Sequence, residues 1–237
     1  MPTIAREKTT APSVNRRSRR TRIALRDALA AEIQATGDLS QVTVTAVTDR
    51  ADVTRRTFYS HYRDIPDLVR CVEDEALEEM RPYVARISET TLDQLKVAID
   101  QFQPCPGSTE FLRYFKKNGA YLSALLGDGG DPSFSKRLSD MVREQAHDRV
   151  AEGFIVPHAD VLIDYYLTFV ISAEVGVLVR WLSTGMQEPV SIVARMMTAM
   201  LFVRPGDLYG RPIGFNIPSI SPQLIAQSKE LLNGSHN

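Results

Sequence analysis

The chain has 237 residues, of which 43% are hydrophobic and 24% are charged, and its formal net charge is −1. This composition is typical of a soluble globular protein with a core of its own. The two cysteines, Cys71 and Cys105, have no CxxC or Cys/His spacing, which argues against a metal site and a disulfide framework. No cofactor is expected.

Charge is divided unevenly along the chain. Residues 1–63 hold 12 Lys and Arg against 6 Asp and Glu, whereas residues 64–237 hold 16 against 23. A basic head on an acidic body indicates that only the head meets a polyanion. The N-terminus is rich in arginine and no apolar run follows it, so a signal peptide is not indicated and a cytoplasmic location is expected.

The first 15 residues lack apolar periodicity and are expected to be disordered. A first helix is expected from about Arg17 to Thr36. Its inward stripe is Ile23, Leu25, Ala28, Leu29 and Ile33. Gly37 suits the left-handed position just past the end of this helix.

Two short helices with nearly repeated start signals follow. Thr43 in VTVTAV and Thr54 in VTRRTF are both helix N-caps, and each follows a valine that can pack one turn into the helix. The RADV turn between the helices requires Asp52 to tolerate a left-handed conformation. Two short helices joined by a tight turn predict a helix-turn-helix.

The remaining sequence shows helical periodicity and no strand alternation, so the predicted fold class is all-α. A fourth helix is expected to start near residues 64–66 and to run through Met80. Later helices are expected at about 91–103, 108–126, 134–152, 159–183 and 189–203.

Four divisions of the chain are expected from these elements. They are a disordered tail (1–15), a helix-turn-helix DNA-binding domain (16–65), a helical effector-binding and dimerisation domain (66–203) and a Gly/Pro-rich tail with one short helix near 222–232 (204–237).

The apolar stretch 159–182 is long enough to raise the question of a transmembrane helix. It is interrupted by Asp160, Asp164, Glu174 and Arg180. A carboxylate in the middle of a bilayer costs roughly 2.5 kcal/mol or more. We therefore expect a helix that is buried in protein.

The second helix of the pair carries a cationic outward face. If Phe58 is at the centre of the buried side, a step of about 100° per residue places Thr54, His61 and Tyr62 beside it. The opposite side and its flank then carry Arg55, Arg56, Tyr59 and Ser60. Arginines near a helix N-terminus are unfavourable alone but favourable when an anion lies in front of them. Arginine also binds guanine bidentately in the major groove, so the pattern indicates a helix that lies in DNA.

The segment VTVTAVTDRADVTRRTFYSHYRDIPDLV (42–69) resembles the DNA-binding domain of the TetR family of bacterial one-component regulators, and it aligns with the family pattern without a gap. Two positions depart from that pattern. Asp52 replaces the usual glycine of the turn, and Ile65 stands where a phosphate-contacting lysine is common. The later segments YFKKNGAYLSALLG and WLSTG are similar to a branch whose C-terminal domains resemble that of the dihydroxyacetone-kinase operon activator.

The resemblance implies a set of DNA-binding residues on the two short helices. They are Thr43, Thr45, Thr54, Arg55, Arg56, Thr57, Tyr59, Ser60 and His61. The segment NRRSRRTR adds a basic arm, in which Arg17, Arg19 and Arg20 are expected to reach phosphates or a minor groove. A passive solubilising tail is the alternative role of this arm.

For the body, the resemblance implies a homodimer formed by the helices near 159–183 and 189–203, and an effector pocket between helices. The effector candidates are polar side chains within apolar helices. They are Tyr114, Asn118, Tyr121, His147, Tyr165 and Trp181, together with Tyr166 and Glu174. Each is also compatible with a satisfied position in a core or an interface.

No enzyme is expected, because the sequence lacks a GxSxG motif, a metal-spaced His/Asp set and a Gly-rich phosphate loop. The expected function is that of a transcriptional regulator that binds a near-palindromic operator in double-stranded DNA as a homodimer. A repressor released by a small-molecule effector is the first expectation. The alternative is an activator or interaction protein on the same fold, which depends on a coactivator protein and binds DNA weakly. No membrane partner is expected.

Overall fold

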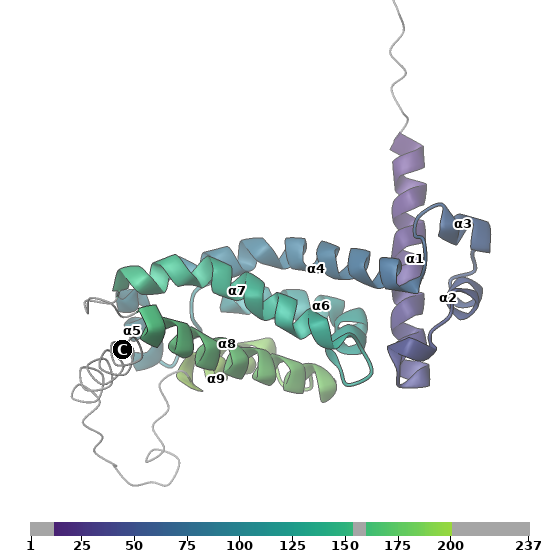
Figure 1. Ribbon diagram of the computed structural model, residues 1–237. Helices are drawn as coiled ribbons and strands as arrows, with labels where there is room; N and C mark the ends of the chain where they lie inside the picture. Colours follow the sequence, from purple (N-terminus) through teal and green to yellow (C-terminus); the bar gives the residue numbers. More distant parts are fainter. Residues whose placement is uncertain (1–11, 154–159, 201–237) are drawn as a thin grey trace, which may run out of the picture. The chain divides into compact units, whose positions relative to one another are not determined.

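The computed structural model describes residues 12–153 and 160–200, and every regular element in these two segments is a helix (Figure 1). The prediction of an all-α fold is confirmed. The chain divides into two compact units. The first unit is Met1–Glu79 with Asn118–Ser135, and the second is Met80–Lys117 with Lys136–Asn237.

The first helix, α1 (Pro12–Thr36), begins earlier than the sequence pattern indicates. Residues 12–15 were expected in the disordered tail, and their backbone is helical instead. Proline suits the first turn of a helix and arginine is a good helix former, so the polar start of α1 needs no apolar stripe. The stripe itself is confirmed at Leu25, Leu29 and Ile33, whereas Ile23 is 40% exposed. Residues 1–11 lie outside the described part of the chain.

The connection after α1 follows the sequence prediction closely. Gly37 has φ +71°, and its N–H donates to the Ile33 carbonyl at 2.8 Å. A single turn of 3-10 helix, η1 (Leu39–Gln41), leads into α2 (Val44–Arg50), and α3 (Arg55–Tyr59) follows. Asp52, in the turn between α2 and α3, has φ 52°, as its place in the RADV turn predicts.

Both predicted N-caps of these helices are confirmed. The side chain of Thr43 accepts a hydrogen bond from the Ala46 N–H, and that of Thr54 accepts one from the Thr57 N–H. α2 packs on α1, and α3 packs on α2. Each short helix places one large apolar side chain, Val47 or Phe58, in the core with no exposed surface. These anchors are needed because a helix of five residues is not stable alone.

Because α3 ends at Tyr59, the residues after it do not continue the helical spacing. Tyr62 is buried, as predicted, but His61 is only half-buried. Thr54 was expected on the buried side and is exposed, because as the N-cap it has extended rather than helical backbone angles.

The fourth helix, α4 (Ile65–Ser88), runs well past Met80 and contains Pro82. Proline normally ends a helix because it lacks an N–H. Here Val84 is buried beyond it, and the Tyr83 ring packs on Tyr114 with centroids 5.8 Å apart. Side-chain packing directly after Pro82 therefore supports the continuation of the helix.

The next helix, α5 (Leu92–Asp100), is shorter than the predicted 91–103. Phe102 was placed in its inward stripe, but it lies past the helix end with φ 52° and is 59% exposed. Among the residues of α5 whose burial is described, Ala98 is the buried one. A left-handed residue at 102 turns the chain away and takes the phenylalanine out of the helical stripe.

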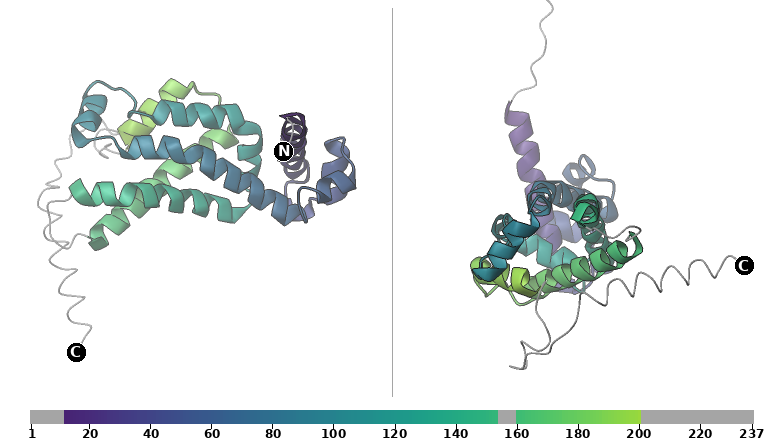
Figure 2. Two further views of the ribbon diagram at one scale, coloured as in Figure 1. Left: turned by 90° about the horizontal axis from the view of Figure 1, so that it is seen from above. Right: turned by 90° about the vertical axis from the view of Figure 1, so that its left-hand side faces the viewer.

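The remaining helices are α6 (Ser108–Leu126), α7 (Pro132–Gly153), α8 (Asp160–Ser183) and α9 (Val190–Met200) (Figures 1 and 2). α4, α6 and α7 each contribute residues to both units. In the second unit, α7 and α8 pack through an apolar cluster. Its members are Ile163, Leu167, Ile171, Val142, Ala146 and Val175. The predicted helix near 222–232 and the whole segment 204–237 lie outside the described residues.

The prediction that α8 is buried in protein is correct for one side of the helix only. Tyr165 is 71% exposed and Phe169 is 73% exposed. By length and composition alone, residues Ile163–Ser183 could cross a membrane. Because α8 is apolar around its circumference, one chain covers only part of its apolar surface.

The split between the two faces of α3 gives a direct test by stability. We expect Phe58→Ala to lower the free energy of unfolding by ~3–5 kcal/mol, because it opens a cavity in a filled core. We expect Tyr59→Ala, one residue away and 59% exposed, to change it by less than ~0.5 kcal/mol. Urea unfolding followed by circular dichroism measures both values. Equal losses in the two variants would contradict the assignment of faces.

Candidate DNA-binding surface and effector site

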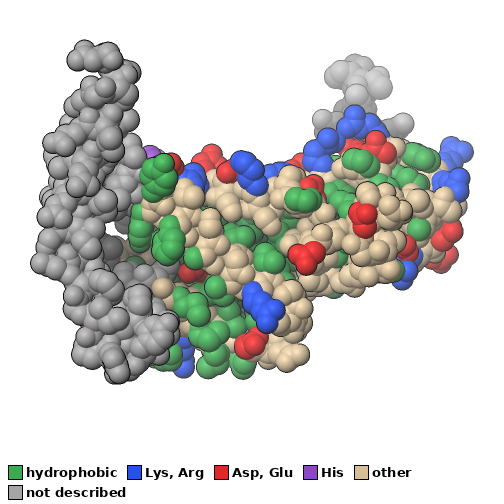
Figure 3. All heavy atoms as spheres, turned by 60° about the horizontal axis from the view of Figure 1, so that its bottom comes forward, with side chains coloured by type: hydrophobic (Ala, Val, Ile, Leu, Met, Phe, Trp, Pro, Cys, Tyr) green, Lys and Arg blue, Asp and Glu red, His purple; other side chains and the backbone are tan. Residues whose placement is uncertain are grey.

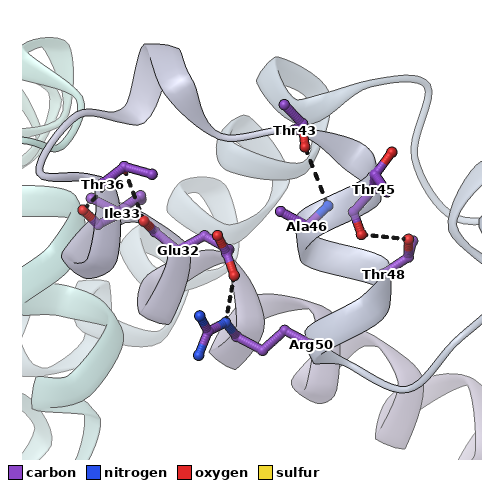
Figure 4. Close-up of polar contacts among 8 residues, drawn as sticks. All are labelled: Glu32, Ile33, Thr36, Thr43, Thr45, Ala46, Thr48 and Arg50. Atoms are coloured by element: carbon purple, nitrogen blue, oxygen red, sulfur yellow. Dashed lines mark hydrogen bonds and ion pairs between the residues drawn. The ribbon is translucent and has the colours of Figure 1, made fainter.

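One polar contact joins α2 to α1 (Figure 4). The Arg50 Nε of α2 donates to Glu32 Oε1 of α1 at 2.5 Å. Within α2, the Thr48 hydroxyl donates to the Val44 carbonyl at 2.9 Å, so this buried threonine is satisfied locally. The N-terminal end of α2, with Thr43 and Thr45, stays exposed to solvent.

Arg56 and Tyr59 form the free outward face of α3. Both side chains are exposed, and the Arg56 side chain makes neither a hydrogen bond nor an ion pair with a described residue. The Tyr59 ring meets Phe58 edge-on, with centroids 5.5 Å apart. Arg55, on the flank, differs from Arg56, because its Nη2 donates to Thr45 Oγ1 of α2 at 2.5 Å. One arginine thus links the two short helices, and its neighbour is available to a partner.

The other hydroxyl candidates are used within α3. The Thr54 and Thr57 hydroxyls lie 2.9 Å apart, and the Ser60 hydroxyl donates to the Thr57 carbonyl at 2.7 Å. His61 lies beside Tyr62, with ring centroids 6.0 Å apart. Thr54 therefore lies before the first turn of α3, Thr57 lies within the helix, and Ser60 and His61 follow its end. Their contact with DNA stays a prediction.

The basic arm belongs to the first turns of α1 rather than to an extended tail. Arg16, Arg17, Arg19 and Arg20 are exposed, and no ion pair joins them to another described residue. Arg22 ends the arm, because its Nη1 donates to Glu75 Oε1 of α4 at 2.8 Å. The four free arginines are thus presented on a helix whose next turn is fixed to α4.

Sequence reasoning missed Arg63, in the turn between α3 and α4. The Asp64 carboxylate caps α4 by accepting from the Asp67 N–H at 2.8 Å. Asp67 Oδ2 accepts from the Arg63 N–H at 2.9 Å, and Oδ1 accepts from Arg63 Nη2 at 3.2 Å. These bonds hold the pKa of Asp67 below its ordinary value, the backbone bond being the larger cause. A basic residue directly before an Asp-x-x-Asp cap was the available signal.

Ile65, which departs from the family's lysine, is buried at the start of α4. It therefore serves the core and does not face a phosphate. Arg63, two residues earlier, is the exposed cation of this turn, and its side chain is 75% exposed.

Six of the effector candidates are divided between the two compact units. Asn118 and Tyr121 belong to the first unit and the other four belong to the second. Tyr121 is buried beneath the Arg26 guanidinium, 4.3 Å from its ring centroid, so it has a partner of its own. Asn118 is half-buried. These two positions support the core of the first unit.

In the second unit, the candidates divide into buried and exposed side chains. Tyr114 packs edge-on against Phe115, and the indole N–H of Trp181 donates to the Glu188 carbonyl at 3.3 Å. His147 and Tyr165 are exposed, as is Tyr166. Two of these four candidates are therefore buried and two are exposed, and their role in binding an effector stays a prediction.

Glu174 is a different case. It is half-buried on α8, and burial raises the pKa of its carboxyl to about 7. It makes no hydrogen bond and no ion pair with a described residue. No group of His, Cys, Asp and Glu within the described segments could hold a metal ion.

Comparison with known proteins agrees with this architecture. Residues 103–202 match a TetR family model described as "Transcriptional regulator C-terminal region". No curated protein matches the chain.

Two solved structures share the fold. A TetR transcriptional regulator from Streptococcus agalactiae 2603V has 21% sequence identity and a TM-score of 0.50, and the match covers 80% of this chain and 97% of that one. The dihydroxyacetone kinase operon activator DhaS has 12% identity and a TM-score of 0.51, with 76% and 93% covered. Residues 103–202 therefore carry the C-terminal region of a TetR family transcriptional regulator. The helix-turn-helix of the first unit and the fold shared with these two structures agree with that match.

Proposed function

We propose that this regulator is a repressor that binds a near-palindromic operator as a homodimer and leaves it when a small molecule binds. In this proposal, residues 16–65 contact DNA, and residues 66–203 hold the dimer interface and the effector. The protein acts in the cytoplasm and catalyses no reaction. The observation that carries the proposal is α3, whose inner face is anchored by Phe58 and whose outer face offers Arg56 and Tyr59 to a partner.

Arg56 is the proposed base-reading residue. Its guanidinium is exposed and unengaged, so binding a guanine edge breaks no bond within the described part of the protein. Arg55 and Thr45 already contact each other, so their positions are fixed. They are therefore better suited to binding one phosphate than to reading a base. Arg63 would add a phosphate contact in place of the lysine that Ile65 replaces.

The basic arm is proposed to contact the DNA backbone. Four exposed arginines within two turns of helix create a strong local positive potential, and no described residue neutralises it. The contact would be electrostatic and independent of sequence.

The dimer is proposed to form through the outer sides of α8 and α9. Hydrophobic side chains gather on this face of the second unit (Figure 3). On α8, the large rings of Tyr165 and Phe169 are followed by small residues, and a Cβ added at Gly176 would meet nothing within 4 Å. On α9, Ile192 and Met200 are exposed. Large exposed apolar residues beside small ones suit close packing of helices from two copies.

The function is tested by selection of genomic DNA fragments with purified protein at moderate salt. We expect enrichment of one near-palindromic site. Arg56→Ala should weaken binding to that site by ~1–3 kcal/mol and relax the preference at one position of each half-site. Arg113→Ala, an exposed arginine of the second unit, is the control and should leave binding unchanged. An unaltered site preference in Arg56→Ala would refute the base contact. Weak, unselective binding by the wild type would favour the coactivator-dependent alternative.

The arm is tested with glutamine at Arg16, Arg17, Arg19 and Arg20, which keeps the helix and removes the charge. The dependence of log affinity on log salt should become less steep by about 0.9 for each phosphate that the arm ceases to neutralise, while the preferred sequence stays the same. Glutamine at four exposed basic residues of the second unit (Arg113, Lys116, Lys117 and Lys136) is the control. An unchanged slope would make the arm a passive segment.

The dimer interface is tested with Phe169→Glu. Two buried carboxylates at a helix–helix contact are costly, so we expect sedimentation velocity to show a monomer and operator affinity to fall. Val97→Glu is the matched control, because Val97 is an exposed apolar residue of α5, outside the proposed face. A dimer that persists in Phe169→Glu would place the contact elsewhere.

A further inference from the structure

Glu174 lies within the inward stripe of α8. The buried residues of that stripe are Leu167, Ile171, Leu178 and Trp181. Glu174 falls between Ile171 and Leu178 at the spacing of successive helical turns, so its side chain leaves the helix toward the interior of the second unit. A carboxylate in the middle of an apolar stripe is costly unless something pairs with it.

The polar groups near this carboxylate are engaged elsewhere. Its charge acts on the Cys105 thiol, whose pKa is raised mainly by burial and further by Glu174. The Cys105 N–H donates to Thr198 Oγ1 of α9 at 2.7 Å, and the Thr198 hydroxyl donates to the Ala194 carbonyl at 2.9 Å. The Cys105 thiol donates to Thr90 Oγ1 at 3.6 Å. In these bonds the amide and thiol of Cys105 and the hydroxyl of Thr198 all donate to groups other than Glu174.

No described cation neutralises Glu174 either. On α7, which packs against α8, Arg143 donates to Asp164 Oδ1 at 2.6 Å and to Thr168 Oγ1 at 2.7 Å. His147 of the same helix is exposed. On α9, Arg195 forms no ion pair with Glu174, and its Nε is buried without a hydrogen-bond partner. Glu174 is nevertheless not fully buried, so part of the residue meets solvent.

We propose that Glu174 is the anchor of the effector site and that the effector is an organic cation, with an ammonium group for the carboxylate and an apolar part for the stripe around it. This inference rests on the proposed function for its regulatory meaning, although the binding site itself is independent of DNA. An anionic ligand would meet an unneutralised carboxylate next to a buried thiol, so it is disfavoured.

The ionisation of Glu174 sets the pH dependence of the site. With its pKa raised to about 7, the carboxyl is mostly protonated at pH 6 and mostly ionised at pH 8. A cation binds the ionised form, so its affinity should rise by about tenfold over this range. A neutral ligand lacks this gain.

The test is isothermal titration calorimetry on the full-length protein with three probes of similar shape: benzylammonium, benzyl alcohol and benzoate. We expect benzylammonium to bind at pH 8 at least tenfold more tightly than the other two, and about tenfold more tightly than at pH 6. Glu174→Gln, which keeps the shape of the side chain, should remove both differences. Glu188→Gln, an exposed glutamate after α8, should retain them.

Equal affinity for the three probes, no pH dependence of benzylammonium binding, or no measurable binding of benzylammonium would each overturn the proposal. Full binding by Glu174→Gln would do the same. If the variant failed to fold, the pH profile of the wild type would still decide. DNA binding is measured separately without probe. If the repressor proposal is wrong, the protein will not bind an operator in this measurement. If only the cation site is wrong, operator binding will remain intact.

Discussion

The proposed DNA-binding surface depends on one buried ring. α3 has five residues, and helix formation has a nucleation cost that so short a segment cannot recover by itself. Phe58 supplies the missing stability by filling the core, and Thr54 supplies the missing acceptor at the N-terminus. The direction of Arg56 and Tyr59 follows from that anchoring, because side chains on so short a helix have only the opposite face left. The packing of Phe58 therefore determines how precisely Arg56 and Tyr59 are positioned.

α8 carries a second constraint, since it is apolar on two sides and one chain can cover only one of them. Its inward residues pack on α7 through Val142 and Ala146. Its outward rings remain exposed in the single chain. A soluble protein rarely leaves a cluster of large apolar side chains in contact with water. The charged residues Asp164, Glu174 and Arg180 make a lipid environment energetically unfavourable for α8. A second protein surface is the solution that fits both facts.

Local chemistry was readable from the sequence, and long-range packing was not. Thr43, Thr54, Gly37 and Asp52 were predicted correctly because a cap or a left-handed turn depends on residues within one helical turn. The continuation of α4 past Pro82 depends on an aromatic contact with α6, which no local pattern contains. Phe102 was misplaced for a related reason, because helical spacing cannot show that the helix stops two residues earlier.

The effector candidates could not be ranked from the sequence by their chance of contacting a ligand. Every polar residue within an apolar helix is equivalent in the sequence, yet Tyr121 and Trp181 are satisfied by partners and Tyr165 faces solvent. Glu174 could be separated only once the inward stripe of α8 was known, because the outward face of this helix is equally apolar and hides the periodicity. The proposed dimer surface lies on the opposite side of the same helix from Glu174. A ligand that neutralises this carboxylate would change the packing of α8 on its inner side, and a rigid helix can transmit such a shift to the face that joins the two copies.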